Sequence, residues 1–274
     1  MGLSSRQRHD EILSQILERG QVEVKTLSRK FAVSEATVRR DLKVLSEEGQ
    51  VDLAYGGATL PRASDFSFHS KATRNVEAKR IIGRLAAQLV GDNEQVCLDS
   101  GTTCFELCRH LKMRRGLLVI VNSARLALEL GTCSEIGVLL LGGQYRPERM
   151  DSVGPLATAT IEQLRGYLAF IGADGLSINF GVSASDIESA HLYRQVIRNA
   201  RETILLADHT KFLAPSLFKI CEMSEISRIV TDRKPGSQWL DFFKDRGISL
   251  YFPEDPASSS ERPPVSDGKG NHST

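Results

Sequence analysis

The feature that most constrains the fold is a series of short apolar runs between residues 76 and 252. Most of these runs are continuously apolar rather than alternating, which is typical of strands buried on both faces of a parallel sheet. The predicted strands are Gln95–Leu98, Leu117–Val121, Gly137–Leu141, Tyr167–Ile171, Ile204–Ala207, Arg228–Thr231 and Ile248–Phe252. Helical patterns separate them, at Ala78–Leu89, Thr103–Leu111, Ala124–Leu130, Ile187–Asn199 and Ser237–Lys244. The sequence therefore predicts an α/β domain with a mostly parallel sheet.

The 274 residues leave room for a second, smaller domain before this one. Residues 1–60 are predicted to form helices followed by a short hairpin, and the polar stretch 61–75 is predicted to be a linker. The tail 253–274 is rich in proline, serine and charge, so we expect it to be disordered. No apolar run is long enough to span a bilayer and the N-terminus lacks a signal peptide, so we expect a cytoplasmic protein.

The first 60 residues have the pattern of three helices and a wing. Gly20 ends the first helix, the second spans about Val24–Phe31, and the third spans Glu35–Ser46. Ser34 is a suitable N-cap for the third helix. Gly49 is expected to stop this helix, and Gln50–Leu53 with Gly56-Gly57 is expected to form a wing hairpin.

One face of the third helix is polar and basic, as a helix that reads the DNA major groove requires. The segment from Lys25 to Lys43 contains six basic and two acidic residues. Residues 1–60 as a whole contain equal numbers of basic and acidic residues, and the whole chain has a net charge of +1. An ordinary three-helix bundle with a solvated charged face remains the alternative at this point. The predicted DNA-contacting residues are Ser34, Glu35, Thr37, Arg39, Arg40, Lys43, Tyr55 and Gly56.

The first strand of the α/β domain ends in a loop suited to an anion. Asp99-Ser100-Gly101-Thr102-Thr103 offers hydroxyl groups and leads into a helix, whose free amides and positive dipole end favour a phosphate. A simple capped helix start would look similar. Polar residues also follow other strands, at Asn122-Ser123, Gly172–Gly175 and Asp208–Lys211. In a parallel sheet such loops converge on one edge, where ligands bind.

Both halves of the chain resemble the DeoR-type family of bacterial regulators of sugar catabolism. In the first half the resemblance rests on Val33–Leu42 and on Tyr55-Gly56-Gly57-Ala58, although the arginine usual in the wing is replaced near Leu53 and Ala54. In the second half it covers nearly all of residues 76–232. The matching stretches are Ala78–Ile82, Leu98–Thr103, Val121–Ser123, Leu141–Arg146, Val153–Leu156, Phe170–Gly175, Ala207-Asp208, Lys211-Phe212 and Ile229–Asp232.

The resemblance implies a sensor domain similar in fold to ribose-5-phosphate isomerases that binds phosphorylated sugars or related metabolites. It implies this role for Lys79, Asp99, Ser100, Gly101, Thr102, Thr103, Asn122, Asp174 and Lys211. Family members often carry an acidic residue and a lysine where this chain has Ser189 and Tyr193. That difference removes an ion pair or changes the ligand.

The leading hypothesis is a metabolite-responsive repressor that binds double-stranded operator DNA as a dimer or tetramer, with no cofactor and no metal. One alternative is a sugar-phosphate isomerase with an accessory domain, for which Asp174, Glu188 and Lys211 are candidate catalytic groups. Against it, Gly175-Leu176-Ser177 stands where such isomerases carry a second acidic residue. The other alternative is a nucleotide-binding scaffold that does not contact DNA.

Overall fold

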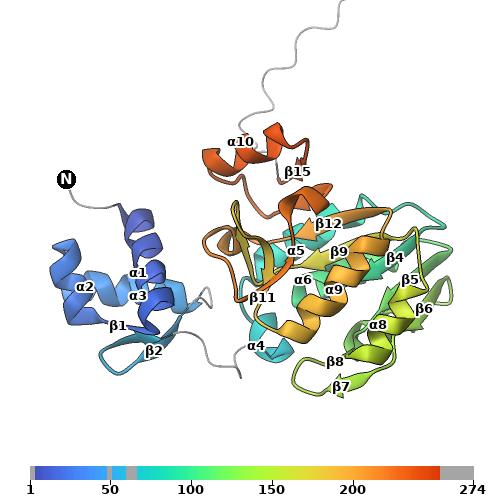
Figure 1. The fold of residues 1–274 in the computed structure, drawn as a ribbon, viewed down its shortest axis with the longest axis horizontal. Coiled ribbons are helices and arrows are strands. Elements are labelled where there is room, and N and C mark those ends of the chain that lie inside the picture. The colour runs from blue at the N-terminus through green and yellow to red at the C-terminus, as the bar shows by residue number, and fades with distance from the viewer. Residues whose placement is uncertain (1–3, 48–50, 60–66, 254–274) are drawn as a thin grey trace, which may run out of the picture.

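The computed structural model describes residues 4–47, 51–59 and 67–253. Gly49 and Gln50, which were expected to end the third helix and begin the wing, lie outside the described residues. So do residues 61–66 of the predicted linker and residues 254–274 of the tail. The smaller N-terminal domain lies beside the larger α/β domain (Figure 1). No helix in the described ranges is both long enough and apolar enough to cross a bilayer.

The N-terminal domain contains the three predicted helices and a small sheet. The helices are α1 (Ser5–Arg19), α2 (Val24–Phe31) and α3 (Glu35–Glu47), and the wing consists of β2 (Asp52–Ala54) and β3 (Gly57–Thr59). A further strand, β1 (Gln21–Glu23), pairs with β3, so the antiparallel order is β1-β3-β2. Sequence reasoning missed β1 because three residues are too few to show an alternating pattern.

A separate apolar core holds these helices together. Ile12 of α1, Leu27 of α2 and Leu42 of α3 are fully buried within it. Gly57 passes so close to β1 that a Cβ atom there would lie 1.9 Å from the carbonyl oxygen of Val22. Only glycine fits at this crossing, which explains Gly57, the second glycine of the wing.

The α/β domain is built on a seven-stranded sheet in which every neighbouring pair is parallel, as the apolar runs predicted. Its order is β15 (Ser249–Tyr251), β14 (Arg228–Val230), β12 (Glu202–Leu206), β9 (Leu168–Gly172), β4 (Gln95–Leu98), β5 (Leu117–Val121) and β6 (Ile136–Leu140). The chain runs from β4 outward to β6, then returns to β9 and continues outward in the other direction. The order therefore reverses between β4 and β9, and ligands of such sheets bind at this switch point.

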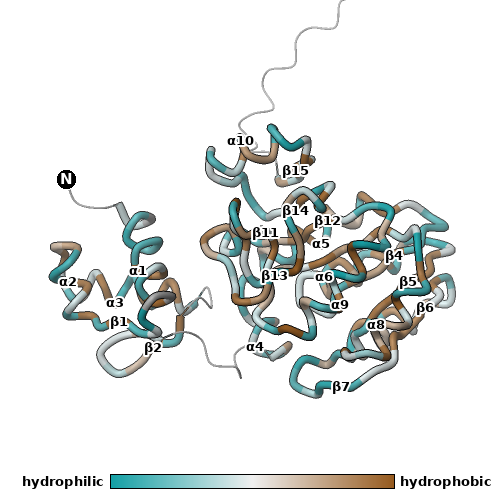
Figure 2. The backbone as a smooth tube through the Cα atoms, in the orientation of Figure 1, coloured by the Kyte–Doolittle hydropathy of each residue, from teal (hydrophilic) through white to brown (hydrophobic). Residues whose placement is uncertain are grey.

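Helices cover both faces of the sheet (Figure 1). One apolar cluster lies under α5 (Val76–Ala87), α6 (Thr102–Leu111) and α7 (Ala124–Leu130). The other lies under α8 (Pro155–Glu162), α9 (Ile187–Asn199) and α10 (Ser237–Asp245). The brown segments in the interior of Figure 2 follow the strands of this sheet.

Several smaller elements were not predicted. A second, antiparallel sheet comprises β10 (Gly175–Ser177), β11 (Gly181–Ala184) and β13 (Phe218–Cys221), and β7 (Gln144–Arg146) pairs with β8 (Asp151–Val153). Two 3-10 turns, η2 (His209–Phe212) and η3 (Met223–Glu225), flank β13. Within the predicted linker the chain forms α4 (Phe68–Ala72), whose Phe68 ring packs edge-on against Phe105 at 5.8 Å. The end of that segment is therefore packed onto the α/β domain.

Candidate DNA interface and effector site

Helix α3 presents the basic face that the sequence predicted. The Ser34 hydroxyl accepts a hydrogen bond from the Thr37 amide at 3.1 Å, so it caps the helix. The side chains of Arg39, Arg40 and Lys43 are exposed. Arg39 donates to Glu35 at 3.0 Å, one helical turn away. These long cations and short polar groups lie on one side of α3, which is available to a DNA duplex.

The wing turn projects Tyr55 into solvent. Tyr55 is fully exposed, and Gly56 adopts a left-handed backbone conformation with φ of 75°. The adjoining strand exposes Leu53 instead of a basic side chain. The wing therefore offers an aromatic ring and backbone groups at its tip.

A buried ion pair fixes α3 against α1. Arg8 donates to both oxygens of Asp41, at 2.8 and 3.1 Å, and His9 approaches the same carboxylate at 3.1 Å. Burial alone would raise the pKa of Asp41, but the hydrogen bonds from Arg8 and His9 outweigh it and hold that pKa below its ordinary value. Asp41 thus orients the recognition helix from its inner side and stays ionised.

A cavity of about 780 Å³ opens at the switch point of the parallel sheet. Its walls come from the loops after β4, β9 and β12, from the segment 71–79, and from the loop 213–217. It also reaches Leu13 and Ile16 of α1, so the cavity extends to the N-terminal domain. Four cationic residues line it: Lys71, Arg74, Lys79 and Lys211.

The carboxylate of Asp99 fixes the loop after β4. Its carboxylate accepts hydrogen bonds from the amides of Gly101 at 2.8 Å and Gly172 at 2.7 Å, which ties the ends of β4 and β9 together. Burial raises the pKa of Asp99, against the effect of these hydrogen bonds. No side chain caps α6, and Gly101, Thr102 and Thr103 line the cavity. The first amides of α6 are therefore available to an anion.

Three carboxylates, those of Asp99, Asp174 and Asp208, line this cavity together with its three lysines. Lys71 Nζ lies 2.5 Å from Asp174, which also accepts from the amide and hydroxyl of Ser185 at 2.9 and 2.8 Å. Lys79 donates to the carbonyl oxygens of Lys71 and Arg74, the latter at 2.6 Å. Burial lowers the pKa of Lys79 to about 8.

The ammonium group of Lys211 donates no hydrogen bond within the described part of the chain and lines the cavity, where it can meet a ligand, while its charge also acts on Asp174 and Asp208. Asp174 is poorly placed as a catalytic base. Burial favours its protonated form, but the nearby lysines and the hydrogen bond from Ser185 outweigh burial and hold its pKa far below the ordinary value. Glu188 is exposed and does not line the cavity.

Ser100 and Asn122 lie behind the cavity wall instead of lining it. The Tyr193 hydroxyl accepts from the Ser100 amide at 2.9 Å and donates to Asn122 Oδ1 at 3.2 Å. Ser100 Oγ also donates to Asp151 at 3.1 Å. Burial raises the pKa of Tyr193 well above its ordinary value, so its phenol is neutral.

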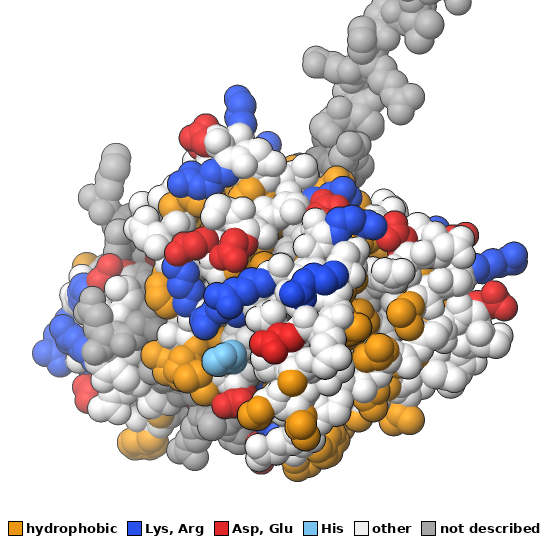
Figure 3. Space-filling model, turned by 45° about the vertical axis from the view of Figure 1, so that its right-hand side comes forward, with side chains coloured by type: hydrophobic (Ala, Val, Ile, Leu, Met, Phe, Trp, Pro, Cys, Tyr) orange, Lys and Arg blue, Asp and Glu red, His pale blue; other side chains and the backbone are white. Residues whose placement is uncertain are grey.

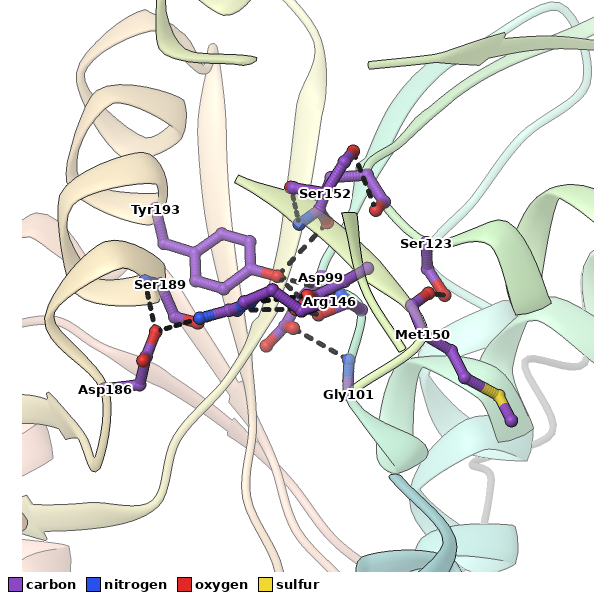
Figure 4. A network of polar contacts seen from close by, with 12 residues as sticks. Asp99, Gly101, Ser123, Arg146, Met150, Ser152, Asp186, Ser189 and Tyr193 are labelled. Atoms are coloured by element: carbon purple, nitrogen blue, oxygen red, sulfur yellow. Dashed lines mark hydrogen bonds and ion pairs between the residues drawn. The ribbon is translucent and has the colours of Figure 1, made fainter. Parts of the chain in front are cut away.

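Arg146 extends this network to Asp186 and Ser189 (Figure 4). It donates two hydrogen bonds to Asp151 at 2.8 Å, one to Asp186 at 2.7 Å and one to Ser189 at 2.9 Å. Ser189 and Tyr193, the two departures noted in the sequence, both line the cavity and both belong to this network. Both side chains carry hydroxyl groups where family members often carry an acidic residue and a lysine, and both hydroxyls are engaged in the network.

The structure therefore brings together most of the residues predicted to bind the effector: Lys79, Asp99, Gly101, Thr102, Thr103, Asp174 and Lys211. Sequence reasoning did not single out Lys71 and Arg74, because both fall in a stretch predicted to be a linker. Asp208 was noted only as part of a strand-end loop. Its carboxylate lies beside Thr210 and Asn75 at the same edge. No cluster of three or more metal-ligating side chains occurs among the described residues.

A winged helix-turn-helix joined to an α/β domain with an anion-receptive cavity defines a ligand-sensing transcription regulator. Two family models match the chain: the DeoR-like helix-turn-helix domain over residues 8–63, and the DeoR C-terminal sensor domain over residues 74–233. The chain belongs to the DeoR family of transcriptional regulators. It binds DNA through the helix-turn-helix domain and an effector through the sensor domain.

Curated relatives are similar over nearly their full length. The transcriptional repressor GlcR of Bacillus subtilis is 32% identical over 248 residues, which cover 89% of this chain and 94% of that protein. The putative aga operon repressor of Escherichia coli O157:H7 is 28% identical, covering 90% and 93%. The glycerol-3-phosphate regulon repressor of Escherichia coli K12 is 26% identical, covering 89% and 97%. These relatives are transcription regulators, not enzymes.

Among solved structures, ribose 5-phosphate isomerase A from Methanocaldococcus jannaschii overlaps the chain with a TM-score of 0.38 and 20% identity. The overlap covers 50% of this chain and 54% of that one.

Proposed function

We propose that this protein represses a carbohydrate-catabolism operon and that a phosphorylated sugar or related metabolite in the cavity alters its affinity for DNA. The observation that carries the proposal is the meeting of four cationic residues and the uncapped start of α6 in one cavity at the switch point. Phosphate is the group that free helix amides and lysine ammonium groups bind together. The relative from Escherichia coli K12 is a glycerol-3-phosphate regulon repressor, which supports a phosphorylated metabolite as the effector.

The same cavity suggests how a ligand changes DNA binding. A ligand shifts an equilibrium only if it binds the two states with different affinity. Leu13 and Ile16 of α1 form part of the cavity wall, and Leu213 packs against the core of the winged helix. A ligand held by Lys71 and Lys211 therefore meets a wall that depends on the position of α1. We propose that occupancy of the cavity changes that position.

A thermal-shift screen of the full chain tests this proposal. The panel contains phosphorylated sugars, sugar acids and their unphosphorylated forms. A ligand that binds only the native state stabilises it by about 2.7 kcal/mol at a hundred times its dissociation constant. We expect a shift with a phosphorylated compound that disappears in Lys211→Ala and in Thr102→Val. If no phosphorylated compound shifts the midpoint, the proposed effector class is wrong.

DNA binding is tested separately with a fragment that the protein selects from a random-sequence pool. We expect the selected site to contain two related half-sites about one helical turn apart, near 34 Å. The hit from the thermal screen is then added to the complex. An unchanged affinity for DNA in the presence of a saturating hit would rule out the proposed regulation, even if the compound binds.

A further inference from the structure

One edge of the parallel sheet is open and apolar. The edge strand β6 pairs with β5 on one side only, and α7 packs over it. Residues 136–143 contain no charged residue and no proline. Leu140 of β6 is 51% exposed and Leu128 of α7 is 75% exposed. Figure 3, in which the right-hand side of Figure 1 comes forward, shows hydrophobic side chains gathered on that side.

The opposite edge of the same sheet is built differently. Strand β15 has three residues, Ser249–Tyr251, and is followed two residues later by Pro253. Short strands and nearby proline are the means by which proteins keep a sheet edge from pairing with another chain. β6 has five residues and neither device. A chain that protects one edge and leaves the other bare indicates that the bare edge is covered in the working assembly.

Successive residues of β6 point their backbone N–H and C=O groups alternately toward β5 and toward the open edge. Gly116 N donates to Glu135 O and Leu141 N donates to Val121 O, so odd-numbered residues face β5. Val138 and Leu140 therefore direct their N–H and C=O groups outward. Within the described ranges, neither amide donates a hydrogen bond to another segment. Water solvates these exposed groups in the single chain, and such an edge is a ready template for pairing with a further strand.

The side chains of β6 are complementary to those of a second β6 in antiparallel register. If Val138 lies on the two-fold axis, Gly137 of one copy stands opposite Leu139 of the other, in the pair type where side chains approach most closely. Gly137 puts no side chain opposite Leu139, and Leu118 Cδ1 packs beside it, 3.4 Å from where a Cβ atom would lie. Leu118 is 40% exposed there. Leu139 of the second copy packs over Gly137 and covers the exposed part of Leu118, and the symmetry repeats the contact.

We propose that β6 is the dimerisation edge of this protein, where it pairs with β6 of a second copy to form one continuous sheet across a two-fold axis. This arrangement is isologous, since the same patch serves both partners. It covers the apolar side chains of Leu118 and Leu140 and satisfies the free backbone groups of Val138. A dimer also suits a reader of two half-sites. The proposal concerns assembly alone and does not depend on the identity of the effector.

The first test is the mass of the full chain in solution, without DNA or effector, by sedimentation velocity. Leu140→Glu places a charge at the proposed interface, and half of this side chain is already exposed in the single chain. We expect it to halve the mass of the assembly with an unchanged circular dichroism spectrum. The matched control, Tyr251→Glu on the opposite edge strand, keeps the wild-type mass.

The second test is a cross-link that does not require breaking the interface. A hydrogen-bonded antiparallel pair has its Cα atoms about 5.5 Å apart, within the range that a disulfide spans. We expect Val138→Cys to form a covalent dimer on oxidation, in a Cys133→Ser background because Cys133 is only partly buried. We expect Tyr251→Cys in the same background to form no covalent dimer on oxidation. A monomeric wild type, an unchanged mass in Leu140→Glu, or no cross-link in Val138→Cys each overturns the proposal.

Discussion

At the scale of single residues, Lys79 shows how a side chain serves two purposes. Its ammonium group donates hydrogen bonds to the carbonyl oxygens of Lys71 and Arg74, and the side chain also lines the effector cavity. Burial lowers its pKa to about 8, while the charge of Asp208 partly offsets burial. The group is therefore charged at neutral pH but close to losing its proton, so its contribution to anion binding depends on pH.

We predict that affinity for the phosphorylated effector falls as the pH rises through about 8. Below this pKa Lys79 is protonated and attracts the anion, and above it the attraction is lost. The phosphate itself contributes no change there, because its second ionisation, near pH 6, is complete. Isothermal titration calorimetry from pH 7 to 9.5 measures the effect. Lys79→Met should bind more weakly and show a flatter profile, and an equally steep profile in that variant would exclude Lys79 as the cause.

The basic face of α3 supports a prediction about DNA. Removing both guanidinium groups in Arg39→Ala/Arg40→Ala should weaken binding to selected DNA about thirtyfold or more, since each bidentate contact of an arginine with a base contributes about 1–3 kcal/mol. Fluorescence anisotropy at fixed salt measures it. Arg165→Ala/Arg198→Ala removes the same charge from exposed positions of the sensor domain and serves as control. Effector binding should be unchanged in both, and equal DNA affinity of the two variants would contradict the assigned interface.

How far the sequence predicts the site depends on where a residue lies. Residues that follow apolar strands, such as Asp99 and Lys211, could be predicted, because the carboxyl ends of parallel strands meet at one edge of the sheet. Lys71 was missed because it reaches the cavity from a polar segment with no periodic pattern. Ser100 and Asn122 were expected to contact the effector, yet the structure places them on Tyr193 behind the wall. Hydrogen bonding between distant residues leaves no pattern in the sequence.

At the scale of elements, length decides what can be predicted. All seven strands of the parallel sheet were located to within about two residues, because each is a buried apolar run between helical patterns. The antiparallel sheet of β10, β11 and β13 was missed. Its strands have three or four residues, and β11 pairs with a distant strand, so Val182 meets Cys221 across 39 positions. Tertiary contacts form that sheet, and local propensity contributes little.

The contact between α1 and α3 gives a prediction at this scale. Arg8→Met leaves Asp41 buried with His9 as its remaining basic partner, and removing one partner of a buried pair costs about 3 kcal/mol. The amides of α3 should lose protection in hydrogen exchange, while those of the sensor domain serve as an internal reference. Lys30→Met breaks an exposed pair with Glu11 and should cost under about 1 kcal/mol. Equal effects of the two substitutions would contradict the role assigned to Asp41.

The same ion pair makes the winged helix sensitive to acid. The pKa of Asp41 is lower in the folded state than in the unfolded state, so the unfolded state binds more protons as the pH falls. The stabilisation is fully present above the unfolded pKa, near 4, and is lost as the pH falls through the folded value. We expect α3 protection in the wild type to decline over that range. In Asp41→Asn the decline should be smaller, and an identical decline would show that other carboxylates cause it.

At the scale of the whole molecule, two surfaces far apart in sequence have to act together. Leu13 and Ile16 of the winged helix form part of the cavity wall, while β6 is an edge strand of the parallel sheet. A single winged helix contacts only a few base pairs, so its affinity for a selected site is limited. Two copies joined at β6 bind the second half-site as an intramolecular step, and such linkage raises affinity by about 10²–10⁴-fold.

We therefore predict that Leu140→Glu weakens binding to a two-half-site fragment but leaves binding to a single half-site unchanged. The physical reason is that α3 and the wing keep their structure, whereas the linkage between the two copies is lost. Fluorescence anisotropy with both fragments at the same salt concentration measures the two affinities. Tyr251→Glu, with the same added charge on the opposite edge, should match the wild type on both. An equal loss on both fragments would mean that the substitution damages the DNA-binding domain itself, and equal wild-type affinity on both would mean that the two copies do not bind as a linked pair.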